Sequence, residues 1–505
     1  MKRIFYYTSK LVLCGALLFS LTSCEKFLDE MPDNRTELDS PEKVKQMLVS
    51  AYSASLPVTM QELMSDNATD YSRNLNVGYD IFQEAYLFAP VTGTGRDTPD
   101  WIWGDNYAAI SSANHALEAM EKLGLGEEMN PQRGEALMCR AYAHFTLVNA
   151  FSQAYNAQSS SKDLGIPYIT EPEKTVFSSV GRGTVAEVYE MIAKDIEAGY
   201  PMINDDVYAQ PKFHFTRKAA ACFAAQFYLY YGNYEKAIEY ANEAIGEDPT
   251  SLMRNWSLYT GTSSDEYTNT YVATEEPANI FCHGFTTVTS RARSYRYIHT
   301  NALLNETLRS RGPWSSYVSN GNIPAYSKAV YVISQRSYFM PKTNEFFMYT
   351  DIANNIGWPY VVVMMFTTEK TILDRAEAYA LMGDFENAMR DLNYFYKQAG
   401  MDHTFTLEEV TSYYESANEL TKKPIAPRFT VEPGTQENLI HAILHARRLV
   451  TLQEGTRLQD LKRYGIAYTH YVDGADNIEI EPYDKRLAIQ LPAAVISAGL
   501  QANPR

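Results

Sequence analysis

Residues 225–249, AQFYLYYGNYEKAIEYANEAIGEDP, constrain the fold most strongly, because they describe two short helices hinged at Gly232. Small and aromatic residues recur there at the offsets of a tetratricopeptide unit, whose length is roughly 34 residues. These residues are Ala225, Tyr228, Gly232, Tyr234, Ala237, Ala244 and Pro249. Glycine tolerates the positive φ of a tight interhelical turn, and the alanines allow two helices to approach closely. The pattern predicts a tetratricopeptide-like pair, and a bare helical hairpin is the alternative.

The first half of the pattern recurs later in the chain with the same offsets, at Ala376, Tyr379, Gly383, Phe385 and Ala388. This copy is degenerate, because Phe395 replaces the trailing alanine and Gly400 replaces the closing proline. Apolar residues at helical spacing predict further helices near residues 41–52, 101–120, 134–151, 184–200 and 437–453. The predicted fold class is mainly α, a tetratricopeptide-like helical scaffold with a long irregular insertion and a loop-rich C-terminal part.

The N-terminus carries the features of an exported lipoprotein. Cations at positions 2, 3 and 10 precede an apolar run over residues 11–21. The sequence Leu21-Thr22-Ser23-Cys24 then looks like the box at which bacterial lipoproteins are cleaved and acylated. Cys24 is therefore the predicted lipidation site, and an unmodified residue after an ordinary signal peptide is the alternative. The three cysteines that remain cannot form a disulfide framework, and we expect Cys139 and Cys222 to be buried in helices.

Composition excludes two classes of function. The formal net charge of −17 and the lack of a basic cluster argue against nucleic acid as a partner. No apolar run beyond the N-terminus approaches the ~18 residues of a membrane span. With 505 residues, the chain is long enough for more than one core.

Several motifs along the chain resemble the SusD/RagB family of outer-membrane lipoproteins of the Bacteroidetes. The C-terminal block is the most specific, although Ala446 and Leu458 depart from the residues that are frequent in the family. In the N-terminal half, the matching motifs are Cys24 followed by Phe27-Leu28-Asp29; Arg182 with Thr184, Val185, Glu187, Val188 and Tyr189; and Arg217 before the 228–237 hairpin. In the C-terminal block, they are Arg447-Arg448-Leu449 and Glu454-Gly455 with Arg457 and Asp460-Leu461-Lys462-Arg463-Tyr464. Leu491-Pro492 and Asn503-Pro504 match at the end of the chain.

The resemblance implies four tetratricopeptide-like units and no catalytic activity, cofactor or metal. It also implies a lipid-anchored protein of the outer membrane, exposed at the cell surface, that captures oligosaccharide, or in some branches peptide, as a lid on a TonB-dependent transporter. The repeats would then be scaffold, and the ligand site would lie on the outward face.

With this resemblance, the chain divides into five predicted parts. These are a signal peptide (1–23), a lipid anchor and tether (24–41), an N-terminal SusD-like helical region (42–250), an irregular insertion facing the ligand (251–365) and a C-terminal SusD-like region with the degenerate repeat (366–505). The insertion is rich in Tyr, Ser, Thr and Asn and is partly strand-like around residues 361–363.

Sugar binding requires flat aromatic faces for the C–H side of the ring and planar polar groups for the hydroxyls. Trp101, Trp103 and Asn106 offer both kinds of group at one loop-to-helix junction, and family members place ligand residues near it. We expect Trp103 and Asn106 to face the same side, being three residues apart. The alternative is that one indole anchors the loop to the core.

Two further groups are candidates for ligand contact. Tyr71 and Arg73 lie in a polar loop with Asp66, Asn67 and Asn74, for which a solvated turn is the alternative. Trp314 and Tyr317 form a possible second platform in the insertion. If Trp103 and Trp314 contact ligand, the double variant Trp103→Ala, Trp314→Ala should lose binding and keep its melting temperature.

Other functions stay open as alternatives. A peptide-binding member of the same family is one. A glycoside hydrolase is another, since a pair of acids could lie far apart in the sequence. A tetratricopeptide adaptor for protein partners would require more clean repeats than are visible. His441 and His445 stand four apart, but Ala442 occupies the position of the catalytic Glu of a zinc protease motif, so we expect surface or packing histidines.

Overall fold

The computed structural model describes residues 38–172, 181–308, 312–317, 330–417 and 421–505. Contacts divide the chain into Met1–Ser40 and Pro41–Arg505, and every helix and strand of the described residues lies in the second unit. The predicted signal peptide, the lipidation site Cys24 and most of the predicted tether lie outside the described residues, so they stay predictions.

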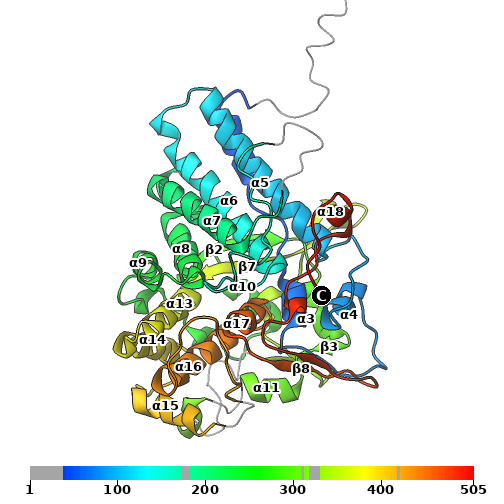
Figure 1. The fold of residues 1–505 in the computed structure, drawn as a ribbon, viewed down its shortest axis with the longest axis vertical. Coiled ribbons are helices and arrows are strands. Elements are labelled where there is room, and N and C mark those ends of the chain that lie inside the picture. Colours follow the sequence, from blue (N-terminus) through cyan, green and yellow to red (C-terminus); the bar gives the residue numbers. More distant parts are fainter. Residues whose placement is uncertain (1–37, 173–180, 309–311, 318–329, 418–420) are drawn as a thin grey trace, which may run out of the picture. The chain divides into compact units, whose positions relative to one another are not determined.

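The second unit is mainly helical, as predicted (Figure 1). The longer α-helices are α5 (Pro99–Lys122), α6 (Asn130–Phe151), α7 (Val185–Gly199), α8 (Arg217–Tyr231), α9 (Tyr234–Ile245), α13 (Thr368–Leu381), α14 (Phe385–Gln398) and α16 (Thr435–Val450). The shorter ones are α2 (Pro41–Val49), α3 (Val58–Met64), α4 (Asp80–Tyr86), α10 (Ser264–Tyr271), α11 (Asn301–Thr307), α15 (Leu407–Glu415), α17 (Thr456–Tyr464) and α18 (Ala493–Ser497).

The strands form small antiparallel sheets. They are β1 (Thr69–Asp70), β2 (Asn279–Phe285), β3 (Tyr297–Ile298), β4 (Tyr331–Ile333), β5 (Ser337–Phe339), β6 (Phe346–Asp351), β7 (Ile356–Thr367), β8 (Tyr468–His470) and β9 (Ile478–Ile480). The largest sheet has the order β2-β7-β6, and the pairs β1–β3, β4–β5 and β8–β9 are separate. Short 3-10 helices, including η7 (Thr289–Ser294) and η8 (Pro313–Ser316), connect these elements.

The predicted hairpin is formed by α8 and α9. Gly232 ends α8 in the left-handed region at φ 80°, and its N–H donates to a carbonyl of the last turn. The side chain of Asn233 then caps α9 by accepting a hydrogen bond from a backbone N–H of the first turn. Ala237 and Ala244 are buried, so the close approach of the two helices is confirmed.

The degenerate copy forms the equivalent hairpin of α13 and α14, with Gly383 at φ 80° in the turn. Helix α13 packs against α8, α9 and α16, so the two repeat copies are neighbours in space (Figure 1). Helices α5, α6 and α7 contact one another in sequence order. The helical pairs therefore cover one another in the way that stacked repeats do.

Local capping explains where helices begin. The Thr184 hydroxyl accepts the N–H of Glu187, whose carboxylate accepts the N–H of Thr184, and this reciprocal pair is the capping box of α7. Helix α2 begins at Pro41, within the predicted helical range 41–52, and buries Val44 and Leu48. Cys139, Cys222 and Cys282 are buried and free.

The C-terminal block forms a buried ion network between α13, α16 and α17. Arg447 of α16 contacts Asp374 and Glu377 of α13 at 3.0 and 2.5 Å, and Asp460 of α17 at 3.1 Å. Arg463 of α17 adds a second contact to Glu377 at 2.7 Å. The conspicuous charges of this block therefore lock three helices together inside the protein.

The predicted insertion holds strands β2 to β7 and several short helices. The predicted strand around residues 361–363 is the inner part of β7, where Val361 and Val363 pack with Phe285 of β2. Strand β6 is the edge of this sheet. None of the described helices has the length and apolar character required to cross a membrane.

Candidate functional site

The start of α5 carries the two tryptophans expected to contact ligand. Thr98 caps the helix through a hydrogen bond from the N–H of Trp101, and Pro99 occupies the first turn. Both indoles are partly exposed. Trp103 packs on Tyr107 and Phe151, with ring centroids 4.8 and 5.2 Å away. Ligand contact by these indoles stays a prediction, and each retains some accessible surface for it.

Asn106 is buried, so it does not present its amide beside the partly exposed Trp103 as expected. The residue is 1% exposed, and its Nδ2 donates to the carbonyls of Ser55 and Ile102 at 3.3 and 2.8 Å. Asn106 lies one helical turn beyond Ile102, and this pair follows the core-facing stripe of α5. The amide is used within the protein and offers its donors to no ligand.

The loop before α5 is held to the end of strand β2. Asp97 is buried at φ 65°, and its carboxylate accepts hydrogen bonds from the Thr287 hydroxyl and the Val288 N–H at 2.7 and 2.8 Å. Burial raises the pKa of Asp97, which these hydrogen bonds partly offset. The same loop directs Arg96 onto the ring of Trp358 on β7, 5.1 Å from its centroid.

An exposed aromatic surface on the β6–β7 hairpin was missed by the sequence analysis. Met348 is paired with Trp358 across the strands. Between Tyr360 and the hairpin turn, side chains on both faces of this ribbon are exposed to solvent. The large exposed apolar residues here are Phe347, Met348, Tyr349, Ile352, Ile356 and Trp358. We call this set, together with Arg96, the hairpin surface. The apolar run at residues 346–349 and the alternating Ile356, Trp358 and Tyr360, on the two sides of Asn354-Asn355, were the signal that could have found it.

The second candidate group, Tyr71 and Arg73, follows β1 and remains at the surface. Tyr71 is 48% exposed, and Tyr471 after β8 is 50% exposed. The backbone N–H of Arg73 donates to Asp473 at 2.7 Å, and its guanidinium lies 3.7 Å from the same carboxylate. The structure therefore adds Tyr471 to the predicted pair and gives a second polar aromatic surface.

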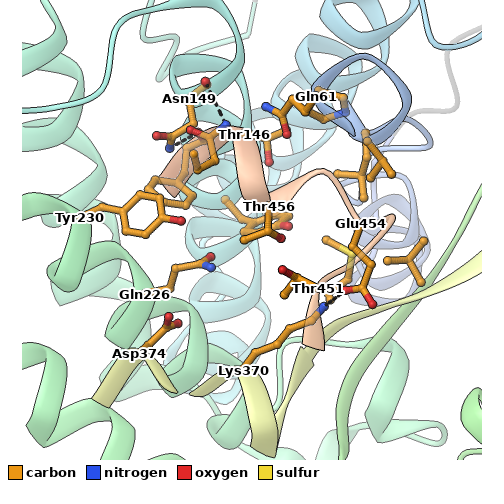
Figure 2. Close-up of a pocket in the computed structure, with 18 of the residues that line it drawn as sticks. Gln61, Thr146, Asn149, Gln226, Tyr230, Lys370, Asp374, Thr451, Glu454 and Thr456 are labelled. Carbon is orange, nitrogen blue, oxygen red and sulfur yellow. Dashed lines mark hydrogen bonds and ion pairs between the residues drawn. The ribbon is translucent and has the colours of Figure 1, made fainter. Parts of the chain in front are cut away.

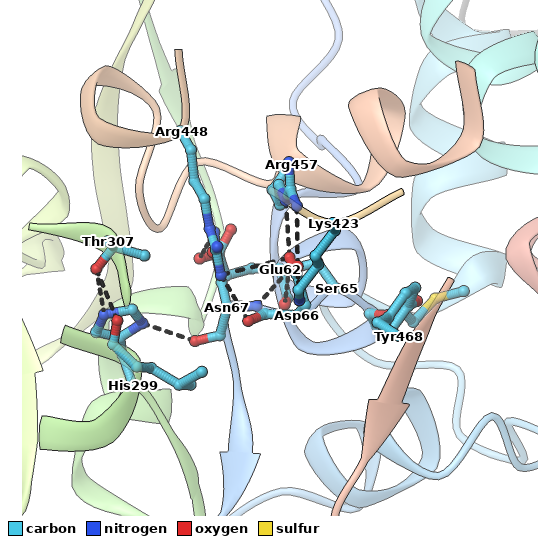
Figure 3. Close-up of polar contacts among 12 residues, drawn as sticks. Glu62, Ser65, Asp66, Asn67, His299, Thr307, Lys423, Arg448, Arg457 and Tyr468 are labelled. Atoms are coloured by element: carbon cyan, nitrogen blue, oxygen red, sulfur yellow. Dashed lines mark hydrogen bonds and ion pairs between the residues drawn. The ribbon is translucent and has the colours of Figure 1, made fainter. Parts of the chain in front are cut away.

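Asp66 and Asn67 do not belong to a solvated turn, because both are buried. Figure 3 shows the polar contacts that hold them. Arg457 makes a two-pronged contact with Asp66 at 2.7 and 2.9 Å, and Lys423 adds a third at 2.6 Å. Burial alone would raise the pKa of Asp66, but Arg448, Arg457 and Lys423 outweigh it and hold that pKa well below its usual value. This anchor fixes the base of the Tyr71 loop.

Trp314 cannot form the expected platform, because its indole is fully buried. It packs against Tyr396 of α14 and His445 of α16, with centroids 5.8 and 5.0 Å away. The prediction that it presents a ring to solvent is wrong, since η8 is folded against these two helices. His445 is partly buried and bonds to the Thr307 carbonyl at 2.9 Å, which agrees with a packing role.

Tyr317 is 44% exposed, but it stacks on His403 at 3.8 Å and its hydroxyl bonds to Glu409 of α15. Helix α15 and the start of α5 lie in separate parts of the ribbon (Figure 1). The structure therefore does not bring Tyr317 together with the α5 tryptophans. The described residues contain no group of three or more His, Cys, Asp or Glu that could hold a metal ion.

Comparison with known proteins agrees with this architecture. Residues 26–229 match a family model described as SusD-like, starch-binding associating with outer membrane. The chain has no significant sequence match among curated proteins.

Solved structures match almost the whole chain. A Bacteroides vulgatus protein whose assigned name is that of a sugar binding protein aligns with TM-score 0.66 at 18% identity, covering 93% of this chain and 99% of its own. A SusD superfamily protein from Bacteroides thetaiotaomicron aligns with TM-score 0.62 at 18% identity, covering 92% and 99%. A SusD-like carbohydrate binding protein from Bacteroides vulgatus aligns with TM-score 0.60 at 17% identity, covering 90% and 96%. These structures share the fold of this chain, and residues 26–229 match the SusD-like family model.

Proposed function

We propose that this protein binds oligosaccharide at the cell surface without catalysing a reaction and passes it to a TonB-dependent transporter. One observation carries the proposal: the hairpin surface exposes several aromatic rings, and it lies beside the loop that leads into the tryptophans of α5. Aromatic faces bind the apolar side of a sugar ring, and Arg96 supplies a planar donor at its edge. The names of the family and of two structural matches refer to starch, sugar or carbohydrate binding and to no reaction.

Trp358 is the residue that we expect to contribute most. It is 50% exposed, and Arg96 holds one part of its ring, so the indole is kept in place for stacking without being covered. A ring positioned in this way loses little side-chain freedom when a ligand binds. Phe347 and Tyr349 lie on the opposite face of the ribbon, which gives two aromatic faces on one hairpin.

The test is electrophoresis of the purified protein through native gels that contain one polysaccharide each. We expect one polymer to retard the protein without being shortened, and Trp358→Ala to weaken its binding about tenfold, or about 1.4 kcal/mol. Ile352→Ala is the matched control, because Ile352 lies on the same hairpin, is 80% exposed and carries no ring. Equal retardation of Trp358→Ala and wild type would refute the assignment, and a shortened polymer would favour a glycoside hydrolase.

The lipid anchor and the transporter are part of the same proposal. The sequence at Cys24 supports acylation, and the family description places such proteins at the outer membrane. Labelling cells with a fatty acid should mark the wild type and leave Cys24→Ala unlabelled. Purification from detergent-solubilised membranes should recover a TonB-dependent transporter with the protein, and its absence from every preparation would contradict the partnership.

A peptide is the second candidate ligand, and one observation favours it. Strand β6 is a sheet edge, and exposed Met348, Ile352 and Ile356 lie beside its aromatic residues. An extended peptide can add to such an edge and bury alternate side chains. Fluorescence anisotropy with a panel of labelled peptides, competed by the polysaccharide panel, separates the two ligands. Binding of peptides that no polysaccharide displaces would move the assignment to peptide.

A further inference from the structure

A cavity of about 140 Å³, partly open to solvent and lined by both polar and apolar side chains, lies in the helical scaffold, separate from the hairpin surface. Residues of α3, α6, α8, β7, α13, α16 and α17 line it, so elements from both ends of the chain meet there. Figure 2 shows the side chains of Gln61, Gln226, Tyr230 and Thr456 around this space. No part of the proposed surface function uses these groups.

Several polar groups of the wall are free for a ligand. The amide of Gln226 and the hydroxyls of Tyr230 and Thr456 make no hydrogen bond within the described part of the chain. Gln459 is 7% exposed, and its Oε1 has no partner although its Nε2 donates to the Asn149 carbonyl at 3.3 Å. Of these groups, the Gln459 Oε1 is a buried atom without a partner, which costs free energy and favours an occupant that can bond to it, and the others offer accessible donors and acceptors beside it.

The charges of the wall are already matched with one another. Lys370 contacts Glu454 at 2.6 Å, and Arg447 contacts Asp374 at 3.0 Å. An ion that entered the cavity would be desolvated without a counter-charge, which is unfavourable. The groups that remain free are amides and hydroxyls, which both donate and accept hydrogen bonds. The wall therefore selects a neutral ligand that carries several hydroxyl groups.

The size of the cavity and its apolar wall define the ligand further. Phe145, Val363 and Met365 provide an apolar side that suits C–H groups. An apolar cavity of about 150 Å³ holds benzene, which has six non-hydrogen atoms. We propose that the cavity binds a small neutral polyol of about six non-hydrogen atoms, such as glycerol. This inference goes beyond the proposed surface ligand and does not depend on it.

The test is saturation-transfer NMR of the purified protein with glycerol, with cyclopentanol as a ligand of the same heavy-atom count and one hydroxyl group. We expect transfer to glycerol and little to cyclopentanol. In Gln226→Met, which keeps side-chain length and removes the amide, glycerol binding should weaken about three- to tenfold, the range for losing one hydrogen bond. Gln83→Met makes the same change on the exposed face of α4 and should bind glycerol as wild type does.

A crystal of the wild type soaked in glycerol gives a second readout that does not depend on any variant. Density for glycerol bonded to Gln226 or Gln459 supports the proposal. It is overturned if the soaked cavity holds water only, if no transfer to glycerol is detected, or if Gln226→Met binds glycerol as tightly as Gln83→Met.

Discussion

Replacement of Arg447 by Met tests the ion network that locks α13, α16 and α17. Arg447 is 3% exposed and is the closest cation to Asp374 and Asp460. Arg463 remains in the variant, at 2.7 Å from Glu377 and 3.8 Å from Asp460. Removing one member of a buried network leaves uncompensated charge and costs about 3–5 kcal/mol. For a unit of this size the entropy of unfolding is about 1 kcal/mol/K, so the melting temperature should fall by about 3–5 °C.

The loss of unfolding free energy in Arg447→Met should depend on pH, and the direction of this dependence follows from Glu377. Burial raises the pKa of Glu377, but Arg447 and Arg463 outweigh it and hold that pKa at about 2. The wild-type carboxylate is therefore ionised throughout pH 5–8. Without Arg447 the folded pKa rises toward or above the unfolded value, so protonation at low pH relieves the uncompensated charge. The difference in unfolding free energy between variant and wild type should be smaller at pH 5 than at pH 7.

Urea denaturation at pH 5 and pH 7 measures both quantities. Lys194→Met is the matched control, because Lys194 pairs with Glu190 on the surface of α7 with both side chains more than half exposed. Such pairs contribute about 0.5 kcal/mol or less. A loss below about 1 kcal/mol for Arg447→Met at pH 7, or an equal loss at both pH values, would refute the reasoning.

Three further predictions concern the scaffold. Gly232→Val should lower the unfolding free energy, measured by urea denaturation, by about 1–2 kcal/mol, because φ is 80° at this residue. Gly232→Asn should recover most of this loss, because asparagine tolerates the left-handed region and no atom lies within 4 Å of a new Cβ. Trp314→Ala should lower the unfolding free energy by about 3–5 kcal/mol, because the indole is fully buried. The double variant with Trp103→Ala should therefore have a lower melting temperature than the wild type, and an unchanged melting temperature would show that Trp314 is exposed. Burial raises the pKa of Glu62 to about 7, so the unfolding free energy of the wild type should fall as pH rises from about 4.5 through 7. Glu62→Gln should flatten this dependence between pH 5 and pH 8, and equal slopes of unfolding free energy against pH in variant and wild type would contradict the prediction.

The helical hairpins could be predicted because their determinants are local. Gly232 and Gly383 each end a helix within a few residues of the apolar positions that define it. The capping box at Thr184 is likewise complete within four residues. Such features depend on backbone geometry and on neighbours in the sequence, so tertiary packing only has to accept them. The order of the helices along the chain follows from the same local signals.

The site was predicted less well, because exposure is decided by distant residues. Trp314 is covered by α14 and α16, which lie far along the chain, and nothing near it in the sequence indicates that cover. Asn106 was assigned to a face by spacing from Trp103, but the core stripe of α5 passes through Ile102. Trp358 was missed because β7 was recognised by its inner residues 361–363, whereas the exposed start of the strand, at residues 356–358, precedes them.

The division between scaffold and surface has a consequence for how this protein could change ligands. The buried ion pairs of Asp66 and Arg447 lie under the loops and between the helices, where a substitution costs stability. The ring of Trp358 is half exposed, and Arg96, which packs on it, comes from a separate loop. A side chain substituted at Trp358 would therefore contact solvent more than the core. Surface substitutions of this kind usually change stability by about 0.5 kcal/mol or less. The hairpin surface can therefore vary in side chain while the scaffold stays fixed, which is the condition for one fold to serve different ligands.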